Sequence, residues 1–596
     1  MGLLQKAVQT YESHASLIGE YISGKAPLAP IAHTVKKADV EITLTAEGDF
    51  YSATNDCSGE QIIIPVSVDS AGRAGKVIAP HPLSDRLCYL APVFPEKYGA
   101  FLEQLTQWTI SEYAHPKLNS ILTYVKNGTI LSDLEHIGII KLTPKGIPEK
   151  EKLLVRWRVM GLGDGQSERC WEDKTLFDSY MNFYRQKQSD DALCMVTGRQ
   201  LPLSKQHPKG IVSIYGNAKL ISANDKTGFT YRGRFAHENQ VATVSYEASQ
   251  KAHNALQWLV DQQGFRAVHG GRTFLCWNPN GRWIEPPTNP LLPKQEPIFR
   301  PSDYQAALKD VLAGRKAEFQ LTDGVVLATF DAATTGRLSL TYYSELQAHD
   351  FLQRLYQWDA ICCWPNRHFG IQSPTLRQIV DCAFGTQRTE KGNVKLETDD
   401  RILRQQLQRL LACRVDRVNL GADVVKALVN RASAPMAYDS YVWENILFTA
   451  CAVIRKYRYD RYKEEWNMSL EPERINRSYQ FGRLLAILEK AERDTYDSKD
   501  GREPNAMRQQ SIFCQRPMYA AGQLEKQLER AYFPRLNPGQ RVYYKNLIGE
   551  IMEIISSFPQ QEWNRPLEDS YLMGYYLQRS ALYTKKTEDM EENING

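Results

Sequence analysis

The spacing of apolar residues changes along this chain, and the change limits the possible folds more than any single motif does. Before about residue 346, several stretches alternate apolar and polar residues, as VEITLTAEGDFYSA does over residues 40–53. Such alternation predicts half-buried β-strands, whereas apolar residues that recur every three or four positions, as they do after residue 346, predict helices. The chain is therefore predicted to be a multidomain α+β protein, in which mixed α/β N-terminal and middle regions precede a C-terminal helical bundle.

The chain is too long for one ordinary hydrophobic core. It has 596 residues, and domains of about 100–200 residues are typical. We predict four regions from composition and periodicity. They are an N-terminal α+β domain at residues 1–190, a middle α+β region at 191–345 with a proline-rich linker or arm at 277–303, a mainly helical region at 346–467, and a separable helical bundle at 468–596.

Two elements of the middle region are clear in the sequence. GVVLATFDAATTGRLSLTYYSEL (324–346) predicts a β-hairpin with a Thr-Gly turn, and residues 245–262 predict a helix that ends near Gly264. The apolar side of this helix would carry Ala248, Ala252, Ala255, Leu256 and Leu259. The polar side would carry Gln250, Lys251, Asn254 and Gln257. His253 leans toward the polar side, so we expect it at a surface or an interface rather than in a catalytic site.

The overall charge does not indicate a particular partner. The chain carries 73 Lys and Arg against 69 Asp and Glu, a net charge of +4, so a nucleic-acid partner would require local segregation of the basic residues. The 11 cysteines are scattered without a C-x-x-C pair, which favours reduced thiols over a disulfide framework or a zinc ribbon. The longest apolar stretches, such as residues 446–454, fall far short of the roughly 20 residues of a membrane helix. The N-terminus lacks the pattern of a signal peptide, and we expect a cytoplasmic protein.

Known catalytic motifs are missing from the sequence. It contains no Walker loop, no dinucleotide-binding glycine pattern, no H-E-x-x-H and no G-x-S-x-G. Cys194 and His207 could form one corner of a metal site, but two ligands do not complete a tetrahedral zinc site. A packed cysteine and a turn histidine are the simpler interpretation. We predict no catalytic residue, no metal and no cofactor, although the lack of a motif does not exclude an enzyme.

Basic residues lie beside aromatic or apolar residues in four stretches. These are a glycine-containing loop that ends at Pro80, in which Arg73 and Lys76 are expected to be exposed, the alternating strand GFTYRGRF at 228–235, the helical stretch at 402–417, and IRKYRYDRYK at 454–463. Phosphates bind cations and bases stack on flat side chains, so each stretch could contact nucleic acid. For any one stretch, cations that extend from a core helix into solvent are the simpler explanation. The presence of four such stretches favours nucleic acid.

A distinctive run in the middle of the chain resembles a known family. The run CMVTGRQLPLSKQHPKGI…AKLISANDKTGFTYRGRF…VSYEASQKAHNALQWL is similar to the large subunit of the type I-C CRISPR surveillance complex, Cascade, which belongs to the Csd family. The resemblance covers essentially the whole chain. It includes MGLLQKAVQTYE at the N-terminus, IIIPVSV…IAPHPLSDRLCYL and the helical tail.

The resemblance implies a function without catalysis. Such a subunit joins a CRISPR RNA, a backbone of repeated subunits and a smaller subunit that holds the RNA 5′ end. It would read the short protospacer-adjacent motif (PAM) in duplex DNA, help to open the duplex into an R-loop, and recruit a helicase-nuclease in antiviral defence. Base pairing with the guide reads the long sequence in such complexes, while protein reads only the short motif.

The resemblance also implies positions for the DNA contacts. The PAM-reading element would be the strand-loop-strand at about 50–90, where Asn55, Arg73 and Lys76 are the candidates. Arg and Asn can make paired contacts to base edges, and Lys suits phosphates. In the alternating strand, Phe229, Tyr231 and Phe235 are expected to pack inward. Contacts to nucleic acid or to a neighbouring subunit are predicted for Lys226, Arg232, Arg234, Arg404 and Arg409.

A second product of the same gene is a further implication, because type I-C systems make their small subunit from an internal start. The residues KEEWNM at 463–468 place Lys-Glu-Glu, whose codons permit a purine-rich ribosome-binding sequence, just before Met468. Lys-Glu-Glu is also common on helices. We predict that Met468 starts a separate helical protein that guides the displaced DNA strand. Its basic candidates are Arg477, Arg483, Lys490, Arg493, Arg508 and Lys526.

Two alternatives remain open from the sequence. The chain could be a stand-alone nucleic-acid-processing enzyme with an unrecognised carboxylate or histidine site. It could also be a scaffold whose basic stretches bind other proteins.

Overall fold

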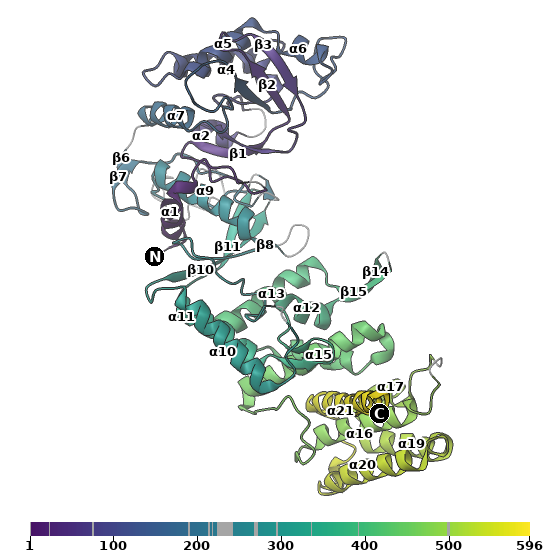
Figure 1. The fold of residues 1–596 in the computed structure, drawn as a ribbon. Coiled ribbons are helices and arrows are strands. Elements are labelled where there is room, and N and C mark those ends of the chain that lie inside the picture. Colours follow the sequence, from purple (N-terminus) through teal and green to yellow (C-terminus); the bar gives the residue numbers. More distant parts are fainter. Residues whose placement is uncertain are drawn as a thin grey trace. The chain divides into compact units, whose positions relative to one another are not determined.

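The computed structural model divides the chain into two compact units. The first comprises residues 1–284 and 323–346, and the second comprises 285–322 and 347–596. The structure describes residues 2–595 with these exceptions: 23, 74–76, 189–190, 213–214, 217, 223–241, 267–271, 294–295, 335, 391 and 498–500. Each unit mixes helices with small sheets, which confirms the predicted α+β class (Figure 1). The finer division into four regions stays a prediction.

The first core of the first unit forms between a three-stranded sheet and two helices. Its sheet has the order β3-β2-β5, with β2 (Val40–Leu44) antiparallel to β3 (Phe50–Thr54) and parallel to β5 (Val155–Val159). Helices α4 (Pro95–Thr109) and α5 (Pro116–Asn127) lie against this sheet (Figure 1). Trp157 of β5 and Trp108 of α4 are both fully buried in the shared core. The alternation in residues 40–53 therefore does produce strands.

Smaller elements complete the first unit. They are α1 (Leu3–Ser13), the antiparallel pair β1 (His33–Lys37) and β4 (Gln61–Pro65), the short helices α2 (Val68–Gly72), α3 (Leu87–Leu90) and α6 (Ile130–His136), α7 (Lys174–Gln186), and the pair β6 (Asp191–Leu193) and β7 (Gln200–Pro202). Tyr184 of α7 accepts a hydrogen bond from the backbone N–H of Val68 at 2.9 Å, so the start of α2 is attached to α7.

The second core of the first unit lies between α9 and a four-stranded sheet of order β11-β10-β9-β8. The strands are β8 (Phe265–Arg266), β9 (Thr273–Trp277), β10 (Gly324–Thr334) and β11 (Arg337–Gln347), and α9 spans Tyr246–Gln263. The predicted hairpin at 324–346 and the predicted helix are both confirmed. Gly264 ends the helix with φ −66°, so it does not use the left-handed conformation that would require glycine there.

Three residues that were expected on the polar side of α9 are buried instead. Gln250 is 3%, His253 2% and Asn254 6% exposed. The Asn254 amide donates to the carbonyl oxygens of Ala29 and Pro30, so the segment before β1 covers this side of the helix. The expectation of a surface role for His253 is therefore wrong. Helical periodicity showed one buried side and could not show that the opposite side is also covered.

The second unit begins with a helical layer and two short hairpins. Its helices are α10 (Pro301–Ala317), α11 (Ala348–Ile361), α12 (Leu376–Phe384), α13 (Asp400–Val415), α14 (Ala422–Ala432) and α15 (Ser440–Tyr462), and its hairpins pair β12 (Trp364–Asn366) with β13 (Gly370–Gln372) and β14 (Thr386–Glu390) with β15 (Asn393–Glu397). Arg414 and Asp359 form a fully buried ion pair at 2.9 Å. Arg414 also donates to the carbonyl of Pro287, and Asp359 accepts from the N–H of Leu291. This part of the proline-rich segment is thus packed and does not form a free arm.

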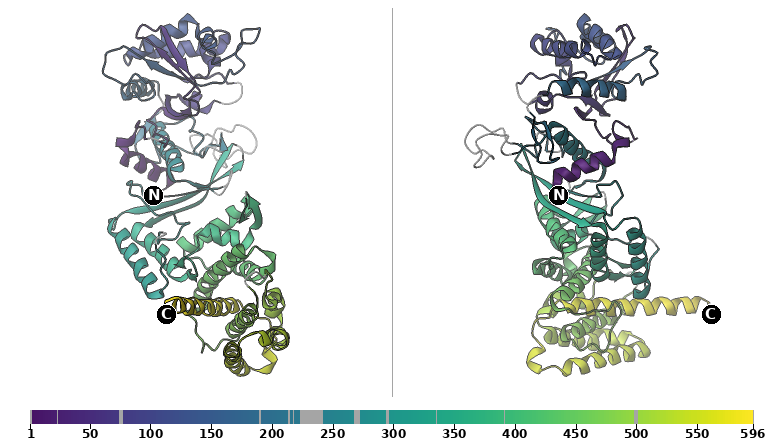
Figure 2. Two further views of the ribbon diagram at one scale, coloured as in Figure 1. Left: turned by 45° about the vertical axis from the view of Figure 1, so that its right-hand side comes forward. Right: turned by 90° about the vertical axis from the view of Figure 1, so that its left-hand side faces the viewer.

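The C-terminal helices form the expected bundle. They are α16 (Arg477–Arg493), α17 (Asn505–Arg508), α18 (Gln510–Gln515), α19 (Pro517–Gln527), α20 (Pro538–Ser556) and α21 (Ser570–Asn595), and the end of α21 extends past its neighbours (Figure 2). Helices α16 and α21 approach so closely that a Cβ added to Gly482 would lie 1.9 Å from the Tyr571 carbonyl oxygen. Cys451 of α15 contacts the carbonyl of Leu572 in α21, so the bundle packs on α15 within the second unit.

Candidate nucleic-acid interface

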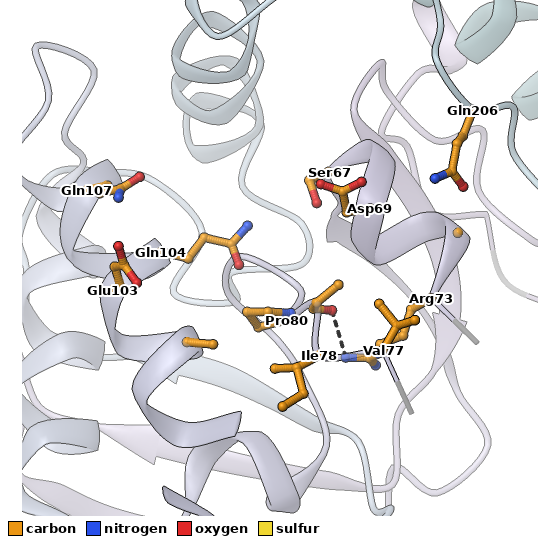
Figure 3. Close-up of a pocket in the computed structure, with 13 residues that line it drawn as sticks. Ser67, Asp69, Arg73, Val77, Ile78, Pro80, Glu103, Gln104, Gln107 and Gln206 are labelled. Atoms are coloured by element: carbon orange, nitrogen blue, oxygen red, sulfur yellow. Dashed lines mark hydrogen bonds between the residues drawn. The ribbon is translucent and has the colours of Figure 1, made fainter. Parts of the chain in front are cut away.

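A groove in the first unit lies between α2, the segment at 77–80 and α4. Its volume is about 510 Å³. The residues that line it are Ser67, Asp69, Gly72, Arg73, Val77, Ile78, Ala79, Pro80, Ala100, Glu103, Gln104, Gln107 and Gln206 (Figure 3). The groove therefore combines an apolar floor with carboxylate, amide and guanidinium groups on its sides.

Local sequence explains how both walls are built. On α4, Ala100, Glu103, Gln104 and Gln107 are spaced so that they share one helix face. On the opposite wall, Ser67 caps α2: its hydroxyl accepts from the N–H of Ser70, while the Ser70 hydroxyl accepts from the N–H of Ser67. This reciprocal capping fixes the first turn of α2, and with it Ser67 and Asp69 in the groove wall.

Arg73 ends α2 and is held by a buried carboxylate. Its guanidinium donates to both oxygens of Asp85, at 2.8 and 2.9 Å. It also donates to the carbonyl of Ala79 at 3.1 Å (Figure 3). It also lies 4.5 Å from the centre of the Tyr89 ring. Only 11% of the Arg73 side chain and none of the Asp85 side chain is exposed, so the expectation of an exposed Arg73 is wrong. Burial is the largest single influence on the pKa of Arg73 and lowers it, but the hydrogen bonds and charge of Asp85, together with the interaction with Tyr89, outweigh burial and raise this pKa.

Four further cations surround Arg73, and together these five form the cationic cluster: Lys36, Arg73, Arg86, Lys209 and Lys219. Lys209 donates to the carbonyl of Arg73 at 2.7 Å, and Lys219 donates to Gln206 at 3.4 Å. Lys36 and Arg86 are exposed and form no ion pair within the part of the chain that the structure describes. The cluster thus contains more cations than Asp85 can neutralise.

The pKa of Lys209 reports this accumulation of charge. Burial, followed by the charges of Lys36, Lys219, Arg73 and Arg86, lowers its pKa to about 8. A bound anion would reduce the repulsion among these cations and favour the protonated lysine. Phosphate groups are the anions that such a set of lysines and arginines binds in nucleic acids. The groove beside the cluster offers hydrogen-bonding groups to the bases that are linked to those phosphates.

The structure brings only part of the predicted PAM-reading element together. Arg73 lines the groove, whereas Asn55 is exposed in the turn after β3 and is not a lining residue. Lys76 lies outside the described residues. Sequence reasoning missed Lys36, Arg86, Lys209 and Lys219, which come from separate segments. Lys209 belongs to the HPKG stretch that the sequence suggested as a corner for metal binding.

The other predicted contact residues are placed as follows. Lys226, Arg232 and Arg234 lie outside the described residues, as does the whole alternating strand. Arg409 donates to both carboxylate oxygens of Asp423, at 2.7 and 2.8 Å, and Arg404 donates to the carbonyl of Asp400. In the stretch at 454–463, Arg458 forms ion pairs with Glu464, Glu568 and Asp569. Its charge is therefore neutralised within the second unit.

Four of the six basic candidates in the C-terminal bundle make internal contacts. Arg477 donates to three backbone carbonyls, and Arg483 is 3% exposed and donates to Gln578 and to the carbonyl of Pro472. Lys490 pairs with Asp494, and Arg493 pairs with Glu503. These four cations stabilise the bundle. Arg508 and Lys526 are exposed and remain available for a displaced strand.

The internal-start and metal candidates occupy packed positions. Met468 is 8% exposed, and its sulfur lies 3.7 Å from the Cys363 thiol. Cys194 accepts from the N–H of Ser245 at 3.2 Å, whereas His207 contacts the Ser249 hydroxyl at 2.8 Å. Within the described residues, no three His, Cys, Asp or Glu side chains come close enough together to hold a metal ion. None of the described helices is long and apolar enough to cross a membrane.

The fold defines an α+β protein whose first unit carries a cationic cluster beside a polar groove. Comparison with protein families then gives the affiliation. The family described as CRISPR-associated protein (Cas_Csd1) matches residues 8–583, nearly the whole chain. The chain therefore belongs to the Cas_Csd1 family of CRISPR-associated proteins. No curated protein matches the sequence.

Proposed function

We propose that this chain is the non-catalytic large subunit of a type I-C CRISPR surveillance complex, and that its first unit binds the duplex that flanks the target. The observation that carries the proposal is the cationic cluster, which lies beside a groove lined by amide and carboxylate side chains. Lys36 and Arg86 are exposed and unpaired within the described chain, and they would contact phosphates. The groove would then face the edges of the base pairs that form the PAM.

The proposal divides the work between phosphate contacts and base contacts. Phosphate contacts give affinity and orientation without sequence preference, while side chains in a groove of the DNA give preference. The Arg73 guanidinium already donates three hydrogen bonds to Asp85 and Ala79, so it would position the groove wall and contribute charge. Residues that read bases would then be found among the groove-lining polar groups of α4 and α2 that the protein does not already engage, which leaves out Gln107, whose oxygen accepts from Lys187.

The remaining roles follow from the family. The subunit would act with CRISPR RNA, backbone subunits, the subunit at the RNA 5′ end, and a small subunit from the same gene that starts at Met468. It would promote unwinding and R-loop formation and recruit the helicase-nuclease. In this proposal it performs no catalysis and carries no metal or cofactor.

The test is binding of the assembled guide complex to target duplexes that carry every variant of the flanking motif. The proposal predicts that affinity depends on the motif, and that Lys36→Gln and Arg86→Gln weaken binding to all variants by a similar factor. Equal binding of every motif by the wild-type complex would contradict it. DNA cleavage by the purified chain with Mg²⁺ alone would instead support the alternative of a stand-alone enzyme.

A further inference from the structure

Three glutamine side chains line the groove, and their hydrogen bonding differs. The Gln107 oxygen accepts from Lys187 at 2.8 Å, and the Gln206 oxygen accepts from Lys219 at 3.4 Å. The Gln104 oxygen is buried and has no hydrogen-bond partner in the described part of the chain. Gln104 is therefore the glutamine of this groove whose amide oxygen is not engaged by the protein.

An unpaired buried carbonyl is costly to the protein. Nearly all buried polar atoms in folded proteins have a partner, and a missing partner leaves the desolvation of that atom uncompensated. The Gln104 amide can turn about its last side-chain bond without breaking any hydrogen bond of its oxygen. In Figure 3, the Gln104 side chain extends from α4 into the space between α4 and α2. A hydrogen-bond donor that enters the groove could therefore bind the Gln104 oxygen, which accepts no hydrogen bond from the described part of the protein.

The charges around the groove indicate which donor fits. Asp69 and Glu103 place carboxylates on its two walls, and Ser67 adds a hydroxyl, so its interior is rich in acceptors. The cationic cluster borders the same groove through Arg73 and through the contact of Lys219 with Gln206. A lysine or arginine from a protein partner would suit the acceptors but would be repelled by the cluster. A nucleic-acid strand carries amino groups on its base edges and negative charge on its phosphates, and it matches both parts.

We propose that Gln104 is a specificity-determining residue that reads an adenine in the major groove of the bound duplex. A glutamine amide matches adenine in two hydrogen bonds, accepting from N6 and donating to N7. Glu103 lies next to it on the same helix face and accepts only, which suits the amino group of a neighbouring cytosine. This inference rests on the proposed function, because it requires that the groove bind duplex DNA.

The experiment compares Gln104→Leu with Gln107→Leu in the assembled guide complex. Gln107→Leu is the matched control because it makes the same change in the same groove, at an amide whose oxygen is already occupied. Binding is measured to duplexes in which each flanking base pair is varied in turn. Gln104 is partly exposed on α4, and thermal unfolding together with complex assembly checks that both variants fold.

The expected result is a loss of preference at one position. Gln104→Leu should reduce the preference for adenine there by roughly 5- to 100-fold, the range of a paired base contact, while binding of the disfavoured duplexes changes little. Gln104→Glu should shift the preference at that position toward cytosine, because a carboxylate accepts from N4 and cannot donate to N7. Gln107→Leu should keep the wild-type preference.

Two results would overturn the inference, and only the second would also contradict the proposed function. If the wild type discriminates and Gln104→Leu keeps its full preference at every position, Gln104 does not read a base, but the proposed function survives. If the wild-type complex does not discriminate among flanking sequences, the inference and the proposed function fail together.

Discussion

The ion pair between Arg73 and Asp85 gives the sharpest stability prediction. Asp85 is fully buried and accepts four hydrogen bonds: two from Arg73, one from the N–H of His81 at 2.7 Å and one from the N–H of Arg86 at 2.7 Å. Asp85→Asn removes the negative charge. It also replaces one accepting carboxylate oxygen with an NH2 group, which donates and would face the donors of Arg73, His81 and Arg86. Arg73 then remains in a largely buried position without its counter-ion.

The expected loss of stability follows from the burial of the ion pair between Arg73 and Asp85. Removing one partner of a buried ion pair lowers the free energy of unfolding by about 3–5 kcal/mol. Because Arg73 is slightly exposed, we expect Asp85→Asn to lower it by about 3 kcal/mol, the lower end of this range. The first unit comprises residues 1–284 and 323–346. An unfolding entropy of about 2.1 cal/mol/K per residue gives a unit of this size a shift of about 1.5 °C per kcal/mol, so its unfolding transition should fall by about 5 °C. Thermal unfolding followed by hydrogen exchange at residues 68–90 would locate the effect.

The control is Asp423→Asn. Asp423 makes the same two-bond pair with Arg409, at 2.7 and 2.8 Å, but its side chain is 51% exposed. Exposed ion pairs contribute about 0–1 kcal/mol, so Asp423→Asn should change stability far less. If Asp85→Asn costs no more than Asp423→Asn, the argument that Asp85 holds the groove wall through a buried pair is refuted.

Two further predictions concern the bundle and the pH dependence of binding. Gly482→Ala should destabilise the C-terminal bundle by about 1–3 kcal/mol, because its Cβ would overlap the Tyr571 carbonyl; Gly549→Ala, which meets nothing within 4 Å, should be neutral or slightly stabilising, and equal melting temperatures would contradict the close packing. Since the pKa of Lys209 is lowered to about 8, Lys209 is mostly charged at pH 7 and mostly neutral at pH 9. Duplex affinity should therefore fall by up to about tenfold between these values, and Lys209→Arg should remove most of that fall; an identical pH profile in the variant would exclude Lys209 from the interface.

Much of the fold could be predicted from the sequence because local patterns determined it. The alternation at 40–53, the hairpin at 324–346 and the C-terminal helices all appear in the structure. The burial of Asn254 could not be predicted, since it depends on carbonyls of a segment more than 200 residues away in the chain. Periodicity describes one element at a time and does not show what covers it.

The candidate site was less predictable for the same reason. The sequence suggested Arg73 as a contact residue but gave no sign that Asp85, twelve residues later, would engage it. The cationic cluster draws on β1, the residue before α3, and two loops near 209 and 219, so no single stretch looks strongly basic. The nearly neutral composition also hides it, because the chain carries 69 Asp and Glu against its 73 Lys and Arg.

The salt dependence of duplex binding tests the central claim most directly. The assembled complex would be compared with its Lys36→Gln/Arg86→Gln variant and with a Lys309→Gln/Lys426→Gln control, which removes the same charge from exposed positions in the second unit. Each lost phosphate contact lowers the slope of log affinity against log salt by about 0.9. We predict that the cluster variant loses about 1.8 in slope and the control loses nothing. Equal slopes for the wild type and the cluster variant would contradict the assignment of the cationic cluster to DNA.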